Sequence, residues 1–142
     1  MAVHSALLRL QTEGEGQIVD LSDGLATALR SAGVEHGVVT VFVTGSTAAI
    51  TTMEHEPGGV QDLQEAIERL VPRRRPEGGE YAHNTRNHDD NAHAHLRASI
   101  LGPSLSIPLV RGSLVLGTWQ QVVLIDFDDR PRERSVHVQI VA

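Results

Sequence analysis

Apolar and polar residues alternate along several short stretches of the chain, which is the period of a β-strand with one buried face. The run of residues 37–44, Gly-Val-Val-Thr-Val-Phe-Val-Thr, is rich in β-branched side chains and is predicted to be a strand buried on both faces. The expected strands are residues 7–12, 18–19, 37–44, 49–53, 105–109, 114–116, 122–127 and 136–140.

Three other stretches carry apolar residues at helical spacing. The first is residues 22–33, with Ser22 as the expected N-cap and Gly33 as the expected end. The others are residues 57–72, which end at a proline, and residues 91–102. Strands that greatly outnumber the inserted helices predict an α+β fold with mainly antiparallel pairing.

Composition limits the protein to one domain, residues 1–142. Aromatic residues make up 3% of the chain, so the core must consist of Val, Leu, Ile and Ala. The net charge of −6 argues against nucleic-acid binding, which needs a basic face. No signal peptide and no membrane span are predicted, so we expect a cytoplasmic protein that does not bind membranes.

Cysteine and lysine are absent from the sequence, and each absence excludes particular kinds of site. Without cysteine there is no disulfide, no thiolate nucleophile and no zinc–sulfur site. All twelve basic residues are arginine, so a Schiff base and a phosphate-binding lysine are also excluded. Any anion must therefore be held by arginine, histidine, hydroxyl groups or backbone amides.

The stretch 81–102 is rich in titratable and metal-ligating side chains, and it follows a long loop that begins at Arg73. Long loops in small domains are often functional. Two adjacent carboxylates, Asp89 and Asp90, lie among histidines that can transfer protons or bind metals. Four of the eight histidines lie here: His83, His88, His93 and His95.

Several motifs occur in an order and spacing that resembles the YjbQ-like family, also called secondary thiamine-phosphate synthase enzymes. They are Glu54 before a helix, Asn-Ala-His-Ala-His-Leu from Asn91, Leu-Gly-Pro-Ser from Leu101, Leu-Gly-Thr-Trp-Gln from Leu116 and Phe-Asp-Asp-Arg-Pro-Arg-Glu-Arg from Phe127. The resemblance covers nearly the whole chain.

The resemblance implies a compact domain with a β-sandwich, assembled as a homotrimer, with a pocket for phosphorylated small molecules near a subunit interface. It also implies a thiamine-phosphate synthase activity that joins an aminopyrimidine diphosphate to a thiazole phosphate. One departure is Gly45, because many members carry a histidine at this position.

His95 and Glu54 are the candidate catalytic residues, since an imidazole and a carboxylate can exchange protons with a ligand. The alternative for His95 is a structural hydrogen bond at the interface. Together with His83 they would also suit a divalent metal ion, either zinc or magnesium. His93 should point away from His95 on a helix, and we expect it to be exposed.

Further candidates would bind the substrate. Ser46 and Thr47, at a break between strands, could hold a phosphate, although a β-bulge would need the same sequence. Asn91 either joins this site or caps the following helix. Arg132 is a candidate anion ligand, or it forms a surface ion pair.

The segment around the single tryptophan supplies the remaining candidates. Thr118 and Gln120 are expected to bind substrate, while Trp119 is expected at a subunit interface. Two functions remain open: a transferase acting on phosphorylated molecules, and a trimeric metal- or ligand-binding protein without efficient catalysis.

Overall fold

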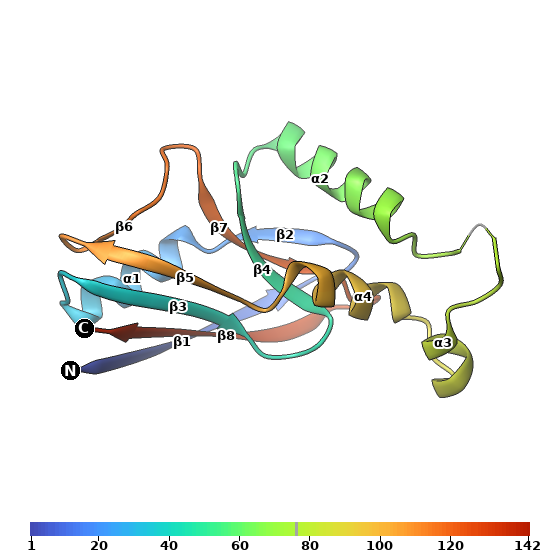
Figure 1. Ribbon diagram of the computed structural model, residues 1–142, viewed down its shortest axis with the longest axis horizontal. Coiled ribbons are helices and arrows are strands. Elements are labelled where there is room, and N and C mark those ends of the chain that lie inside the picture. The colour runs from blue at the N-terminus through green and yellow to red at the C-terminus, as the bar shows by residue number, and fades with distance from the viewer. Residues whose placement is uncertain (76) are drawn as a thin grey trace.

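A computed structural model describes residues 1–75 and 77–142 (Figure 1). It confirms an α+β single domain whose strands pair antiparallel throughout the described residues. The five-stranded sheet has the order β1 (Val3–Thr12), β8 (Arg132–Val141), β3 (Gly37–Val43), β5 (Ser104–Val110) and β6 (Ser113–Leu114). The three-stranded sheet has the order β2 (Gln17–Asp20), β7 (Gln121–Asp126) and β4 (Ala48–Met53). The helices are α1 (Ser22–Ala32), α2 (Pro57–Leu70), α3 (Ala82–Asn87) and α4 (Ala92–Leu101).

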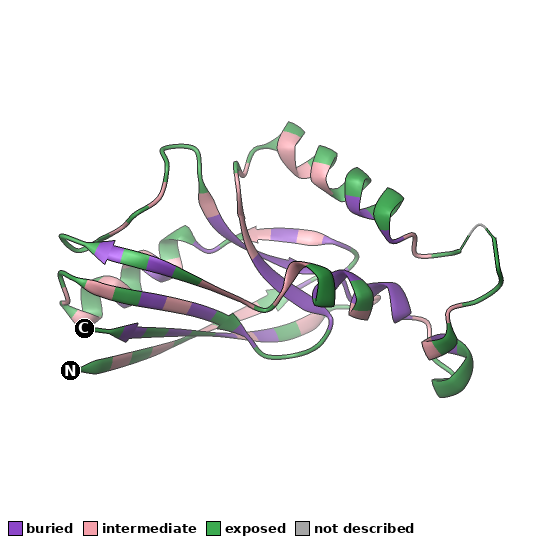
Figure 2. Ribbon diagram, viewed as in Figure 1, coloured by how far each residue is buried: buried purple, intermediate pink, exposed green. Residues whose placement is uncertain are grey.

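Two apolar clusters build the core. The first joins the facing sides of the two sheets, including Val41 and Leu124, and is closed by α1 through Leu25. The second lies on the opposite face of the three-stranded sheet, where Ile125 packs with Ile67 of α2 and with alanines of α4. The three-stranded sheet is therefore covered on both faces, and β7 is almost entirely buried (Figure 2).

The prediction that residues 37–44 are buried on both faces is wrong. Burial alternates along β3, with Val39, Val41 and Val43 inside and Val38 and Phe42 exposed. The cause is its place in the five-stranded sheet: one side of β3 joins the core cluster, and no helix of the described residues covers the other side. The doubly buried strand is β7 instead.

Two helix starts show how local polar groups set the boundaries. Ser22 is the first residue of α1 and not its N-cap, because Asp20 Oδ1 accepts from Ser22 N (2.9 Å) and Oγ (2.5 Å). Gly33 ends α1 as predicted, at φ +65°. At α2, the Glu56 carboxylate accepts from the amides of Gly58 and Gly59, which satisfies donors that a helix start leaves free.

The chain between the predicted strands and helices also differs from expectation. Residues 44–47 are not a β-bulge: they carry the chain from the five-stranded sheet to the three-stranded sheet. The stretch 73–90 contains α3, a fourth helix that was not predicted. No helix in the described part of the chain has the length and apolar character needed to cross a membrane.

Candidate functional site

The histidines at the junction of α3 and α4 form the centre of the candidate site. The ring centroids of His83 and His95 are 4.6 Å apart, with the planes inclined by 53°. The two residues reach each other because α3 folds back against the start of α4. We call His83, Asn91 and His95 the imidazole cluster.

Hydrogen bonds fix the state of His83. Its Nε2 lies 3.1 Å from Asn91 Oδ1, and its Nδ1 lies 3.3 Å from Asn87 Nδ2. A carboxamide oxygen only accepts and a carboxamide nitrogen only donates. His83 is therefore the neutral tautomer with its proton on Nε2, and both of its ring nitrogens are already used.

His95 differs from His83 because no neighbouring side chain among the described residues hydrogen-bonds to its ring nitrogens. No hydrogen bond to its ring is formed by the described residues, whereas its backbone carbonyl accepts from Ser99 Oγ (2.9 Å). The side chain is half-buried at the start of α4. Among the two histidines of the imidazole cluster, His95 is the one free to exchange a proton or bind a ligand.

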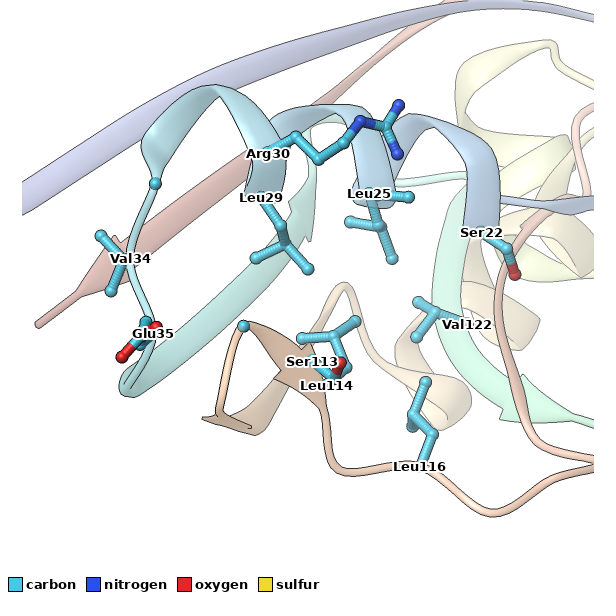
Figure 3. A pocket seen from close by; sticks show the side chains of 13 residues that line it. Ser22, Leu25, Leu29, Arg30, Val34, Glu35, Ser113, Leu114, Leu116 and Val122 are labelled. Atoms are coloured by element: carbon cyan, nitrogen blue, oxygen red, sulfur yellow. The ribbon is translucent and has the colours of Figure 1, made fainter.

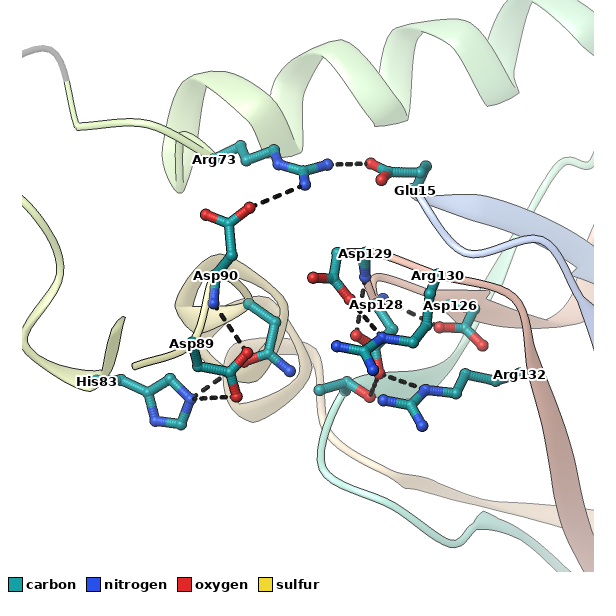
Figure 4. A network of polar contacts seen from close by, with 12 residues as sticks. Glu15, Arg73, His83, Asp89, Asp90, Asp126, Asp128, Asp129, Arg130 and Arg132 are labelled. Carbon is teal, nitrogen blue, oxygen red and sulfur yellow. Dashed lines mark hydrogen bonds and ion pairs between the residues drawn. The ribbon is translucent and has the colours of Figure 1, made fainter. Parts of the chain in front are cut away.

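The two neighbouring carboxylates have different partners (Figure 4). Asp89 Oδ2 lies 3.7 Å from His83 Nε2. Asp90 is instead held by Arg73 (3.5 Å) and Arg74 (2.8 Å). Arg73 also pairs with Glu15 at 2.5 Å, so these arginines tie the segment after α2 to the start of α4.

A buried ion pair joins Asp126, the last residue of β7, to Arg134 of β8. Arg134 donates to both oxygens of Asp126, at 2.6 and 2.8 Å, and to Thr47 Oγ1 at 2.7 Å. Burial alone would raise the pKa of Asp126, but the bonds from Arg134 and Thr12 lower it. Thr47 also donates to Asp128 Oδ2 (3.0 Å), so this predicted phosphate ligand already has intramolecular partners.

Two arginines on the turn are oriented by aspartates. Arg132 Nε donates to Asp128 at 2.8 Å, and Arg130 Nε donates to Asp129 at 3.0 Å. Burial opposes ionisation of Asp128, yet bonds from the Asp129 amide, Thr47 and Arg132 hold its pKa well below its usual range. The bond to Asp129 raises the pKa of Arg130. Each Nε is bound, which leaves the terminal nitrogens of both arginines to face a ligand.

Gly45 occupies a position that restricts side chains. Its φ is +115°, a region that favours glycine, and a Cβ there would lie 2.8 Å from Arg134 Nη1. A histidine here would therefore require Arg134 to move. The neighbouring Ser46 is exposed and its hydroxyl is available to a ligand.

The remaining candidates gather at another place. Glu54 directly follows β4 and is exposed, and Thr118 and Gln120 are exposed on the loop before β7. Gln120 Nε2 donates to Thr52 Oγ1 (3.1 Å), which joins this loop to the end of β4. We call residues 115–120 the tryptophan loop.

The predicted contact between Glu54 and His95 does not form within one chain. β4 and α4 meet where Ile50 N donates to Gly102 O (3.1 Å), and from there β4 leads towards α2 while α4 leads back to α3 (Figure 1). No three histidine, aspartate or glutamate side chains in the described residues are arranged to hold a metal ion. The set His83, His95 and Glu54 therefore does not fit a metal within a single chain.

The prediction that His93 is exposed is wrong. His93 is buried, with 1% of its surface exposed, and its Nδ1 has no hydrogen-bond partner. Burial, with Arg97 and Arg73 nearby, lowers its pKa, so it is neutral at pH 7. The helix does separate it from His95, but His93 lies on the buried face of α4, which it shares with Arg97.

A cavity of about 550 Å³ lies elsewhere, between α1 and β6 (Figure 3). Leu25, Leu29, Leu114 and Leu116 form much of its wall. None of the predicted site residues lines it. The sequence offered no signal for it, because the apolar residues concerned are those that any amphipathic helix and edge strand would carry.

Comparisons with known proteins agree on one relationship. Residues 6–142 match the family model described as UPF0047 protein YjbQ-like. A UPF0047 protein of Methanothermobacter thermautotrophicus is 34% identical over 140 residues, which cover 99% of this chain and 93% of the relative. A UPF0047 protein of Archaeoglobus fulgidus is 37% identical over 132 residues, covering 93% of this chain and 97% of the relative.

Solved structures show the same similarity. A hypothetical protein from Aeropyrum pernix K1 superposes with a TM-score of 0.87 at 34% identity, and 98% of each chain is covered. A protein of unknown function from Sulfolobus solfataricus P2 gives a TM-score of 0.85 at 33% identity, again with 98% of each chain covered.

Proposed function

Because the chain belongs to the UPF0047 family of YjbQ-like proteins, we propose that it binds phosphorylated small molecules at the imidazole cluster and transfers a group between them. The proposed reaction is the one the sequence resemblance implies, formation of thiamine phosphate from an aminopyrimidine diphosphate and a thiazole phosphate. The single observation that carries the proposal is the free His95 ring beside the fully hydrogen-bonded His83.

Two other groups of the chain are suited to phosphate, and the proposal assigns them to the same ligand. Ser46 offers a hydroxyl, and Arg132 offers terminal guanidinium nitrogens while Asp128 fixes its orientation. The bond from Arg132 to Asp128 leaves the guanidinium partly exposed, so an approaching anion need not break it. In a chain without lysine these are the cationic and donor groups that the chemistry requires.

In this reaction a carbon–nitrogen bond forms between the thiazole nitrogen and the pyrimidine methylene carbon while the carbon–oxygen bond to diphosphate breaks. Negative charge grows on the departing diphosphate. His95 in its protonated form would donate to that oxygen, and Arg132 would stabilise its charge. His83 and Asn91 act as positioning residues, because they hold the neighbouring ring in place.

A second candidate is a protein that binds a phosphorylated ligand without efficient catalysis. The observation in its favour is that Glu54, the predicted second proton-transfer group, does not meet His95 within one chain. A cluster with one free imidazole can bind an anion without catalysing its reaction.

The test is a product assay with both thiamine precursors, using wild type, His95→Ala and the matched control His36→Ala, an exposed histidine in the α1–β3 loop. The transferase predicts that His95→Ala loses about 100-fold or more in rate, which is typical for removal of a general acid, while the control keeps full activity. Binding of both precursors by wild type, without product, would support the binding protein instead.

A further inference from the structure

The cavity between α1 and β6 is separate from the candidate site and has no role in the proposed reaction. Its volume of about 550 Å³ lies within the range of about 300–1,000 Å³ that is typical of small-molecule sites. Leu25 and Leu29 of α1 form one wall, and Leu114 and Leu116 face them from the other side (Figure 3). The cavity is therefore large enough for a ligand, and its lining determines which kind of ligand fits.

The cavity exists because β6 is very short. β6 pairs with β5 through two residue pairs, Leu109 with Leu114 and Val110 with Ser113. The chain then leaves the five-stranded sheet and enters the other sheet at β7, so no strand of the described residues closes the space between β6 and α1. The opening therefore follows from the order of the strands and not from the position of a single side chain.

Apolar side chains line the interior of the cavity, and polar side chains lie at its rim. Leu25 and Val122 are almost completely buried and belong to the main core cluster, so the cavity reaches the core of the domain. The polar side chains of the lining are all exposed: Ser22, Arg30, Glu35 and Ser113. A polar ligand group deep inside would lose its bonds to water without gaining side-chain partners, which costs free energy. The inner part of the ligand must therefore be hydrocarbon, which excludes a peptide backbone, a sugar and the phosphorylated molecules of the proposed function.

The rim carries an arginine that no carboxylate of the described residues neutralises. Ala26 and Arg30 are four residues apart, so they share the ridge of α1 that borders the cavity. Arg30 Nη2 donates to Thr27 Oγ1 (3.2 Å), and Arg30 has no ion-pair partner in the described part of the chain. Its guanidinium lies on the Leu25 side of the cavity, while the other charged lining residue, Glu35, lies at the opposite end (Figure 3). An anionic head group is therefore favoured beside Arg30 and disfavoured beside Glu35.

We propose that this cavity binds a single-chain monocarboxylate, a medium-chain fatty acid of about eight to twelve carbons, with its hydrocarbon chain between the leucines and its carboxylate at Arg30. A guanidinium binds a carboxylate through two parallel hydrogen bonds, and Thr27 occupies only one donor of Arg30. The single negative charge of the ligand matches the single unpaired arginine of the rim. The site is independent of the imidazole cluster, so it binds its ligand whether or not the proposed reaction takes place.

Calorimetric titration of the wild-type protein with octanoate and decanoate, each below its micelle concentration, tests the apolar part of the site. Each buried methylene should tighten binding about fourfold, so we expect the Kd of decanoate to be about 15-fold lower than that of octanoate. Absence of saturable decanoate binding, or equal Kd values for the two acids, would overturn the proposal.

Substitutions that fill the cavity test the location of the ligand. Ala26→Phe adds a ring to the cavity wall at α1, and Ser113→Phe adds one at β6 on the other side. Each ring takes the place of several methylenes, each of which contributes about fourfold, so each variant should weaken decanoate binding by about tenfold or more. The control Ser31→Phe, an exposed position of α1 outside the cavity lining, should leave the Kd unchanged.

The two filling variants lie on different elements, so a folding defect in one, detected by urea unfolding, leaves the other to decide the result. Decanoate binding that survives both rings unchanged would place the ligand elsewhere and contradict the proposal.

Arg30→Glu tests the head group. It replaces an attraction at the surface by a repulsion of similar size, so decanoate binding should weaken about tenfold, while binding of uncharged decanol should change by less than about twofold. Arg86→Glu, at an exposed position of α3, is the control for net charge and should have little effect on either ligand. Equal weakening of decanoate and decanol by Arg30→Glu, or equal effects of the two charge variants on decanoate, would refute the placement of the carboxylate at Arg30.

Discussion

His83 and His95 lie with their ring centroids 4.6 Å apart, and only His83 has both ring nitrogens engaged by neighbouring side chains. Two adjacent histidines thus have different roles. Asn87 and Asn91 hold the His83 ring in one neutral tautomer and one orientation. His95 is the group available for proton exchange or ligand binding. The difference follows from α3, whose last turn supplies Asn87 to one side of His83.

Replacing Asn91 by alanine should release the His83 tautomer. Asn91 Oδ1 is the acceptor for His83 Nε2–H, and Asn91 is buried, so no protein group takes its place. Long-range ¹⁵N–¹H spectra of wild type should show His83 as the Nε2–H tautomer, and spectra of Asn91→Ala should show a mixture of the Nε2–H and Nδ1–H tautomers. Loss of one hydrogen bond should lower the free energy of unfolding by about 1 kcal/mol. A wild-type spectrum with the proton on Nδ1 would contradict the assignment.

Removing Arg134 should destabilise the fold strongly. It leaves Asp126 buried without its cationic partner, and such a loss costs about 3–5 kcal/mol. The matched control is Arg130→Ala, because Arg130 is exposed and solvent screens its pair with Asp129, so its removal should change stability little. Urea unfolding of both variants measures the difference. Equal, small losses would show that the buried ion pair does not stabilise the fold.

His93 should make stability depend on pH. Its folded pKa is lowered, so below the ordinary histidine value of about 6.5 the unfolded chain takes up a proton that the folded chain does not. The free energy of unfolding is therefore full above this pH and falls as pH decreases below it. The charged groups that act on His93 are Arg97, Arg73, Glu15 and Asp90.

Urea unfolding of wild type and His93→Leu at pH 7.5 and 5.5 checks this. Wild type should lose more stability than the variant between the two values. At pH 7.5 the variant should lie within about 1 kcal/mol of wild type, because His93 Nδ1 has no partner to lose. A parallel decline of both proteins would assign the pH dependence to other groups.

The sequence predicts the elements of this fold well, since turns and helix ends carry local signals. Gly33 and Pro57 mark real boundaries, and the alternation of Ile107 and Leu109 matches a strand with one buried face. Burial of β3 could not be predicted, because its exposed Val38 is as apolar as its buried neighbours. Only the position of the strand within its sheet determines which face is covered.

The sequence predicted the residues of the imidazole cluster, but it did not predict that Glu54 lies apart from them. His83, Asn91 and His95 come together, as expected for a polar loop that leads into a helix. The buried pair of Asp126 and Arg134 had a signal, since carboxylates and arginines alternate at strand spacing on either side of one turn. The separation of Glu54 from His95 had none, because it depends on how β4 crosses α4.

The most direct test of the account is a titration of wild type with the aminopyrimidine diphosphate, followed through the ring ¹⁵N signals of the histidines. Single histidine substitutions assign the signals, and His36 serves as the internal reference. We predict that the His95 signals shift with saturation, that those of His83 move less, and that those of His36 stay fixed. Saturable binding that leaves His95 unchanged would place the ligand elsewhere and contradict the central claim.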